Sequence, residues 1–204
     1  MNTAKVIMRR FYRQAGGDPQ RLPWHREEPD RMLAAAAKGG PGRALDVGCG
    51  AGVFAVYLAQ QGWRVTGIDL FDEAIAMARA RATDARVQVE LIRSDLFDYT
   101  PDEPFQLAYD SGCLHWLVGG DIDRYKRQLL RWLALGGEYV LGHWGKRHSL
   151  DWRPVGPRRR VESTIKRIFS PELELLDSEV TDADVPLPFG PRVHAVGYRF
   201  RRTS

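Results

Sequence analysis

The chain has 204 residues, of which 44% are hydrophobic and 27% are charged, and this balance is typical of one globular domain. Its net charge of +4 is a weak indication of an anionic partner, and no run of about 18 apolar residues predicts a membrane span. The two cysteines form neither a disulfide framework nor a zinc motif, and we find no secretory signal. We therefore expect a cytoplasmic protein without a metal site.

The first forty residues are predicted to form a helical cap. Two helical patterns, at 6–15 and 28–38, flank a loop that contains the sequence "LPWH". The glycine-rich segment 39–43 joins this cap to the rest of the chain. We therefore divide a single domain, 1–204, into a cap (1–40), a core (41–145) and a C-terminal part (146–204).

Short apolar strands alternate with helical patterns in the body of the chain, which favours a mostly parallel α/β sheet with helices on both faces. Strands are expected at 43–47, 63–70, 87–95, 105–112, 138–144, 173–181 and 192–202. Helices are expected at 53–61, 72–82, 121–135 and 158–169. The third of these helices is predicted to end at Gly136 and Gly137, and the last two strands predict an antiparallel edge.

A glycine-rich loop follows the first predicted strand and opens a helix, as in many cofactor sites. The loop reads "VGCGAGV", with glycines at 48, 50 and 52. Glycine permits positive φ and lets a ligand approach the backbone, and the helix behind presents free N–H groups. The dinucleotide fingerprint would place its third glycine at Val53, so this spacing argues against a dinucleotide. A purely structural turn is the alternative interpretation of the glycines alone.

Three acidic residues end three successive predicted strands. Asp46, Asp69 and Asp95 are therefore expected to meet in one crevice at the carboxyl edge of the sheet. So much negative charge would repel a pyrophosphate, whereas it suits a sulfonium cofactor that also carries an amine, a ribose and an adenine. The pattern favours S-adenosylmethionine, although Asp69 could instead cap the following helix.

Five segments resemble the class I S-adenosylmethionine-dependent methyltransferases, in order and at normal spacing over residues 43 to about 145. They are "LDVGCGAG", "GIDL", "SDLF", "YDSGCLHWL" and "LALGGEYVL". The resemblance implies a Rossmann-like, doubly wound sheet of seven strands whose last strand is antiparallel. It also implies S-adenosylmethionine as cofactor and S-adenosylhomocysteine as product. "YDSGCLHWL" and "LPWH" are similar to the small-molecule branch, which includes thiopurine, tellurite-type and bacterial natural-product enzymes.

The resemblance also implies roles for the residues that match. The methionine part of the cofactor would lie against the loop residues Gly48, Cys49, Gly50 and Gly52. Asp46 would orient this loop and the amino group of the cofactor. Asp69 would hold the ribose hydroxyls.

The adenine end of the cofactor is assigned in the same way. Leu70 would pack on the adenine face, and Asp95 would accept a hydrogen bond from the adenine amine, with Ser94 and the backbone of Leu96 beside it. Asp110, which ends the fourth strand, would lie near the methionine amino group or the transferred methyl, where we also consider it as a catalytic residue.

Two histidines follow predicted strands at the same edge of the sheet. His115 lies after the fourth strand and His143 ends the fifth. A histidine with a pKa near 6.5 can take a proton from a phenol, thiol or amine near neutral pH. Both are therefore candidate general bases, and the alternative is that they only shape the pocket while proximity supplies the catalysis.

Aromatic residues gather in the segments predicted to border the crevice. The resemblance implies that the N-terminal cap closes over the cofactor as a lid that includes Trp24, and Trp116 and Trp144 follow predicted strands. Indole rings at a site favour a flat, apolar acceptor, although core packing is the alternative for each ring. Arg153 could add recognition of a carboxylate or phosphate.

These observations predict a methyltransferase that acts on an O, N or S atom of a small aromatic or heteroaromatic molecule, in natural-product biosynthesis for example. The basic run at residues 158–160 leaves a nucleic-acid methyltransferase open as an alternative, although we expect no nucleic-acid partner. A protein that binds S-adenosylmethionine without transferring methyl is the second alternative. We expect a monomer or a homodimer.

Overall fold

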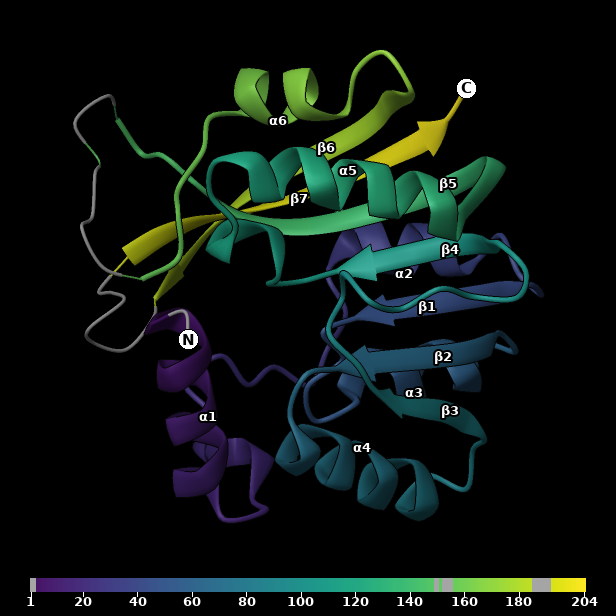
Figure 1. Cartoon of the computed structure of the whole chain (residues 1–204), viewed down its shortest axis with the longest axis vertical. Helices are drawn as coiled ribbons and strands as arrows, with labels where there is room; N and C mark the ends of the chain where they lie inside the picture. The colour runs from purple at the N-terminus through teal and green to yellow at the C-terminus, as the bar shows by residue number, and fades with distance from the viewer. Residues whose placement is uncertain (1–2, 149–150, 152–155, 185–191) are drawn as a thin grey trace.

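A computed structural model describes residues 3–148, 151, 156–184 and 192–204, and it is built on one sheet of seven strands (Figure 1). The strand order is β3-β2-β1-β4-β5-β7-β6. The strands are β1 (Arg43–Val47), β2 (Arg64–Asp69), β3 (Val89–Arg93), β4 (Phe105–Asp110), β5 (Leu133–Gly145), β6 (Leu173–Asp184) and β7 (Arg192–Arg202). The first five pair in parallel, and β7 pairs antiparallel with both β5 and β6. The predicted fold class is confirmed.

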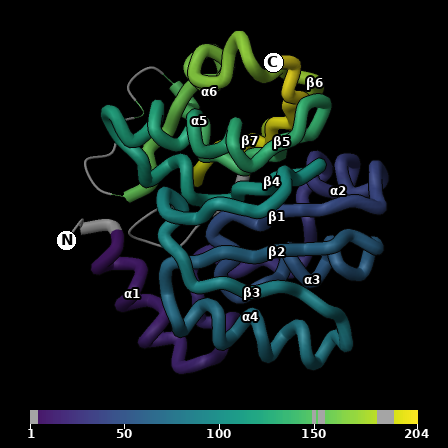
Figure 2. Tube along the Cα trace, turned by 45° about the vertical axis from the view of Figure 1, so that its right-hand side comes forward, coloured from purple at the N-terminus to yellow at the C-terminus, as the bar shows by residue number. Residues whose placement is uncertain are grey.

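Helices cover both faces of the sheet (Figure 2). They are α1 (Thr3–Ala15), α2 (Arg31–Ala37), α3 (Val53–Gln60), α4 (Asp72–Asp84), α5 (Gly120–Trp132) and α6 (Glu162–Phe169), with 3₁₀ turns η1 (Pro19–Arg21) and η2 (Leu114–Trp116). One core cluster joins α5 and α6 to the sheet through Trp132 and Phe169, and a second joins α2 and α3 to it through Leu33 and Leu58. The helices of these two clusters pack against the sheet and so fix the positions of its strand ends.

The predicted end of the long helix is wrong by three residues. The helix α5 ends at Trp132, and Leu133 already belongs to β5, where it pairs with Phe105 across a register shift. Leu133 is fully buried in the core, so its packing decides the helix end. Gly136, at φ 74°, bends the first part of the strand instead of capping the helix.

The order of the strands reverses direction between β1 and β4. From β1 the chain moves toward one side of the sheet, to β2 and β3, whereas from β4 it moves toward the other side, to β5. Doubly wound sheets bind ligands at the carboxyl edge where this reversal occurs. The glycine-rich loop after β1 and the turn η2 after β4 both lie at this edge. The topology therefore positions the predicted site.

The helix α1 packs on the site end of the molecule (Figure 1). Its residues Tyr12 and Ala15 form a small apolar cluster with Ala51 of the glycine-rich loop and with Phe71 and Met77 at α4. The predicted cap therefore covers the loop, while the division of the chain into three parts stays a prediction. Within the described residues, no helix is both long and apolar enough to span a bilayer.

Candidate active site

A cavity of about 600 Å³ lies at the carboxyl edge of the sheet, between α1 and the strand ends. It brings together most of the predicted site residues: Trp24, Asp46, Gly48, Cys49, Gly50, Asp69, Leu70, Ser94, Asp95, Leu96, His115, Trp116, His143 and Trp144. Its volume is within the range of small-molecule sites, roughly 300–1,000 Å³. Gly52 and Asp110 do not line it, and Arg153 falls outside the described residues.

The glycine-rich loop requires glycine because of its positive φ angles and because neighbouring side chains lie close to its backbone. Gly48 has a φ of 68°, and a Cβ atom there would collide with the sulfur of Cys113. Gly52 has a φ of 76°, and a Cβ atom there would lie 2.8 Å from the Cβ of Ala78 in α4. Gly52 therefore permits the close approach of α4, while the glycines at 48 and 50 face the cavity.

Asp69 holds the loop in place. Its carboxylate accepts hydrogen bonds from the backbone N–H groups of Gly50 and Phe71, both at 3.0 Å. Burial raises the pKa of Asp69 to about 6, against the effect of these hydrogen bonds. Asp69 therefore shares the loop-orienting role that we predicted for Asp46, which itself accepts a backbone hydrogen bond from Ala55 of α3. The backbone of Leu70 is a third donor to Asp69, so one lone pair of this carboxylate stays open for a ribose hydroxyl.

Asp46 is a buried carboxylate that lacks a counter-charge. It is only 2% exposed, it lines the cavity, and its Oδ2 atom has no hydrogen-bond partner within the described part of the chain. Burial, together with nearby Asp69 and Asp110, raises its pKa to about 8 despite a backbone hydrogen bond from Ala55. An ammonium or sulfonium group would supply the missing charge, so Asp46 fits the predicted cofactor.

Asp95 has a partner that the sequence analysis missed. Lys5 of α1 lies 2.6 Å from its Oδ2 atom, and the N–H of Phe97 donates to Oδ1 at 3.0 Å. Partial burial raises the pKa of Asp95, but Lys5, the N–H of Phe97 and nearby Arg124 together outweigh it, and the pKa is lowered. The cap thus reaches the carboxylate that we predicted for the adenine amine, and Ser94 and Leu96 lie beside it in the cavity wall.

Asp110 does not have the predicted catalytic position. Its carboxylate is fully buried and accepts hydrogen bonds from the N–H groups of Gly112, Cys113 and Leu114 and from the hydroxyl of Tyr125 at 2.6 Å. These four donors occupy the lone pairs of a carboxylate. Asp110 therefore shapes the turn that carries His115, and we no longer assign it to catalysis or to cofactor binding.

His115 and His143 form a pair in the cavity wall. Their ring centroids are 5.5 Å apart, both rings are buried, and the Nδ1 atom of each has no partner within the described segments. Burial, helped by nearby Arg160, lowers the pKa of His115 to about 3, and the pKa of His143 is also well below its usual value. Both imidazoles are therefore neutral at pH 7, with unused hydrogen-bonding capacity at the cavity.

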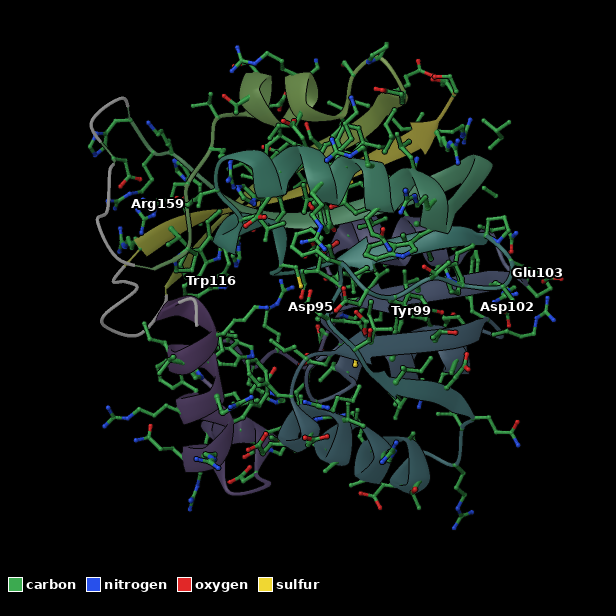
Figure 3. All side chains as sticks on the ribbon, in the orientation of Figure 1. Asp95, Tyr99, Asp102, Glu103, Trp116 and Arg159 are labelled. Carbon is green, nitrogen blue, oxygen red and sulfur yellow. The ribbon has the colours of Figure 1, made fainter. Side chains whose placement is uncertain are left out.

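The tryptophans divide between the two ends of the cavity. Trp144 and Trp116 lie beside His115, with ring centroids 5.5 and 6.2 Å away (Trp116 is labelled in Figure 3). Trp24 instead meets Phe11 and Tyr12 of α1 edge-on, so it belongs to the cap. The end near the histidines is thus lined by indole and imidazole rings.

Sequence reasoning missed Lys5, Tyr12 and Arg160. The helical spacing of Met8, Phe11, Tyr12 and Ala15 marks an apolar face that could have placed Tyr12 over the loop. For Arg160 the sequence holds no such signal, because it is the last of three consecutive arginines.

Comparison with known proteins decides the family. Residues 44–137 match the family described as "Methyltransferase domain". The matched range includes the glycine-rich loop and the strands that carry the acidic residues. The chain carries a class I S-adenosylmethionine-dependent methyltransferase domain. Nodulation protein S of Rhizobium tropici is 36% identical to this chain over 148 residues. The match covers 69% of this chain and 61% of the relative. The predicted superfamily and its cofactor are confirmed.

Solved structures agree with the fold of this chain. A structure from work on the conversion of a disulfide bond into a thioacetal group during echinomycin biosynthesis has a TM-score of 0.72 at 24% identity, and the match covers 97% of this chain and 92% of that one. The 1,6-didemethyltoxoflavin-N1-methyltransferase of Burkholderia thailandensis has a TM-score of 0.72 at 20% identity, over 98% and 89% of the two chains. At these identities the likeness shows the fold alone.

Proposed function

We propose that this protein transfers the methyl group of S-adenosylmethionine to an O, N or S atom of a small aromatic or heteroaromatic molecule. The observation that carries the proposal is one cavity with two chemically different ends. The buried carboxyl group of Asp46, which has no positive partner, lies at one end, and a pair of neutral histidines with two tryptophans lies at the other.

The chain's own residues supply binding, orientation and proton removal. When bound, the cofactor supplies a methyl group activated by a positive sulfur. Asp46 and Asp69 are the residues that would hold its amine and its ribose, and the apolar walls exclude water. His115 is a weak base because its pKa is lowered to about 3, but it would still take the proton as an oxygen or sulfur acceptor is methylated, since the positive charge that develops on that atom makes its proton strongly acidic. Much of the rate enhancement then comes from holding the two reactants in line.

The surroundings of the basic run at 158–160 favour a small acceptor over a nucleic acid. Arg159 is buried in an ion pair with Asp151, with contacts of 2.7 and 2.8 Å. The guanidinium of Arg160 donates to backbone oxygens inside the protein. Only Arg158 of the three is exposed, so the run forms no cationic patch for a phosphate backbone.

A methylation screen tests the proposal. We would incubate the protein with S-adenosylmethionine and a panel of phenols, thiols, amines and ring N–H heteroaromatics, and measure S-adenosylhomocysteine release. Release with at least one small acceptor is expected. Cofactor binding without release from any acceptor would instead support the alternative of a protein that binds S-adenosylmethionine and does not transfer its methyl.

Histidine variants test the proposed base once an acceptor is known. We expect His115→Ala to lower kcat by about 100-fold, because a positioned general base typically contributes that much, while the affinity for S-adenosylmethionine changes little. His194→Ala is the matched control, since His194 pairs with Asp182 and does not line the cavity. If the His115 variant keeps full rate across pH, proximity alone supplies the catalysis.

A further inference from the structure

Arg160 ties together the two segments that carry the histidine pair. Its guanidinium donates to the backbone oxygens of Leu114 at 3.2 Å and Leu117 at 2.6 Å, on either side of the turn η2 that carries His115. Its backbone N–H donates to the oxygen of Trp144 at 3.1 Å, at the end of β5 beside His143. The residue is partly buried, so a charge that sequence reasoning places in solvent lies behind the cavity wall.

The same guanidinium determines which nitrogen of His143 carries the proton. Its Nη1 atom lies 3.4 Å from Nε2 of His143. A guanidinium can only donate hydrogen bonds, so Nε2 of the neutral ring must accept. The ring proton is then on Nδ1, the buried atom that has no partner among the described residues. His143 therefore carries an unpaired, buried N–H donor in a ring that lines the cavity.

The charge of the cavity is divided between its ends. The three carboxylates of the predicted cofactor site, Asp46, Asp69 and Asp95, lie near the glycine-rich loop, whereas Arg160 lies behind the histidines. The charged and titratable groups found to act on the histidine pair are Arg160 and the two rings themselves, within the described segments. A positive charge that cannot be removed therefore faces the end of the cavity left for the acceptor.

We propose that Arg160 is a positioning residue for methyl transfer, which fixes the Nδ1–H tautomer of His143 and selects acceptors that enter without a positive charge. This inference rests on the proposed function. The acceptors that fit are phenols and thiols, whose reacting atom has a lone pair and carries no positive charge. Alkyl ammonium ions do not fit, because they are repelled by Arg160 and have no free lone pair.

Methyl transfer to such an acceptor is a displacement at the methyl carbon. The lone pair of its O or S atom forms the bond to the methyl carbon. The bond between that carbon and sulfur breaks, and its electron pair stays on sulfur. The acceptor's proton passes to His115, which returns it to solvent after the product leaves.

Nitrogen NMR of the full-length protein with ¹⁵N-labelled histidine tests the positioning role without any acceptor. In the wild-type protein we expect His143 as the Nδ1–H tautomer and no protonation of either ring between pH 5.5 and 8. Arg160→Gln should move His143 toward the commoner Nε2–H tautomer and raise the titration midpoint of His115, which is followed down to the lowest pH at which the protein stays folded. Wild-type His143 in the Nε2–H form would overturn the proposal, and this readout does not require the variant to fold.

Arg158→Gln is the matched control. Arg158 is exposed on the same segment, and its contact with the oxygen of His115 uses the backbone N–H, so the substitution keeps that contact. We expect its histidine spectrum to be unchanged. A shift of the same size in this variant would mean that general surface charge, and not the geometry of Arg160, sets the state of the pair.

Selectivity is the second readout. For a phenol and a benzylamine of similar size, we expect Arg160→Gln to lower the ratio of kcat/KM in favour of the phenol by about tenfold. Arg160→Lys keeps the charge but loses the planar fork, so it should keep the selectivity and lose the tautomer preference. A ratio unchanged in Arg160→Gln contradicts the proposal, whereas no turnover with any acceptor contradicts the proposed function and leaves the NMR result to stand.

Discussion

At the scale of single residues, the most unusual group is the Asp46 carboxylate. It is nearly inaccessible, its Oδ2 atom is unpaired within the described residues, and its pKa is raised to about 8 mainly by burial. In water a carboxyl group loses its proton near pH 4, so this one is protonated at pH 7 in the unliganded protein. A cationic ligand stabilises the ionised form, and binding is therefore coupled to proton release.

This coupling gives a pH-dependent affinity. Between pH 6.5 and 7.5, we expect the affinity for S-adenosylmethionine to rise by up to about tenfold, because the carboxyl must ionise to pair with the ligand. Asp46→Asn should remove this slope and weaken binding. Calorimetry in buffers with different ionisation enthalpies measures both the affinity and the protons released.

The control for this measurement is Asp102→Asn. Asp102 is exposed at the opposite edge of the sheet from Asp95 (Figure 3), so its removal should leave the slope unchanged. If Asp46→Asn binds with the wild-type pH dependence, another group supplies the proton and Asp46 does not meet the cofactor.

At the scale of elements, the approach of α4 to the glycine-rich loop depends on Gly52. An added methyl group there would lie 2.8 Å from the Cβ and 2.9 Å from the Cα of Ala78, and the φ of 76° is strained for any other residue. We expect Gly52→Ala to lower the free energy of unfolding by about 1–3 kcal/mol and to weaken cofactor binding. Denaturant unfolding and calorimetry check the two effects.

Gly62→Ala separates strain from crowding. Gly62 has a φ of 88°, but a Cβ atom there would meet nothing within 4 Å. We expect it to destabilise the fold through backbone strain alone and to leave cofactor affinity unchanged. Equal effects from the two variants would mean that the contact with α4 contributes nothing.

The elements also show what could be predicted from the sequence. Alternating strands and helices, with the two late strands, were enough for the sheet and its antiparallel edge, because hydrophobic periodicity reports burial directly. The end of α5 was not predictable from Gly136, because the packing of Leu133 against the core outweighs a local helix-end signal.

Side-chain partners in the site could be predicted only in part. Asp46 and Asp69 are at the expected strand ends, since chain order and parallel pairing place them there. The saturation of Asp110 by three N–H groups and Tyr125 depends on a turn and a helix that meet only in three dimensions. The inward direction of Arg160 likewise depends on where η2 and β5 place their carbonyl groups.

At the scale of the whole molecule, buried titratable groups act on stability in opposite directions. The carboxyl of Asp46 has a raised pKa, so the folded state holds a proton that the unfolded chain releases, and stability falls as pH rises toward 8. The histidines have lowered pKa values, so the unfolded chain binds more protons and stability rises with pH up to about 6.5. Above about pH 6.5 the histidines therefore change the stability little, and the effect of Asp46 can be measured separately.

We expect the stability of the unliganded protein to fall by about 1 kcal/mol between pH 7 and 8.5. Over this range the histidines are largely neutral in both states, and Asp46 loses the proton that the folded state holds. The buried thiols of Cys49 and Cys113, whose pKa values are raised, add a smaller fall in the same direction, because the unfolded chain releases their protons first. Denaturant unfolding at the two pH values measures the change. Asp46→Asn should lack most of it, and a fall of the same size in that variant would assign the effect to another group.

The contact between Lys5 and Asp95 joins residues 90 positions apart in the chain, and it is one of the bonds that hold α1 over the end of the cavity predicted for adenine. Lys5 is 46% exposed, so dissolved ions reach this pair and weaken it. The cap is thus fastened to the third strand by an attraction that depends on the surrounding electrolyte. We therefore expect ionic strength, which leaves the apolar contacts of Tyr12 in place, to change how fast the cofactor enters and its product leaves.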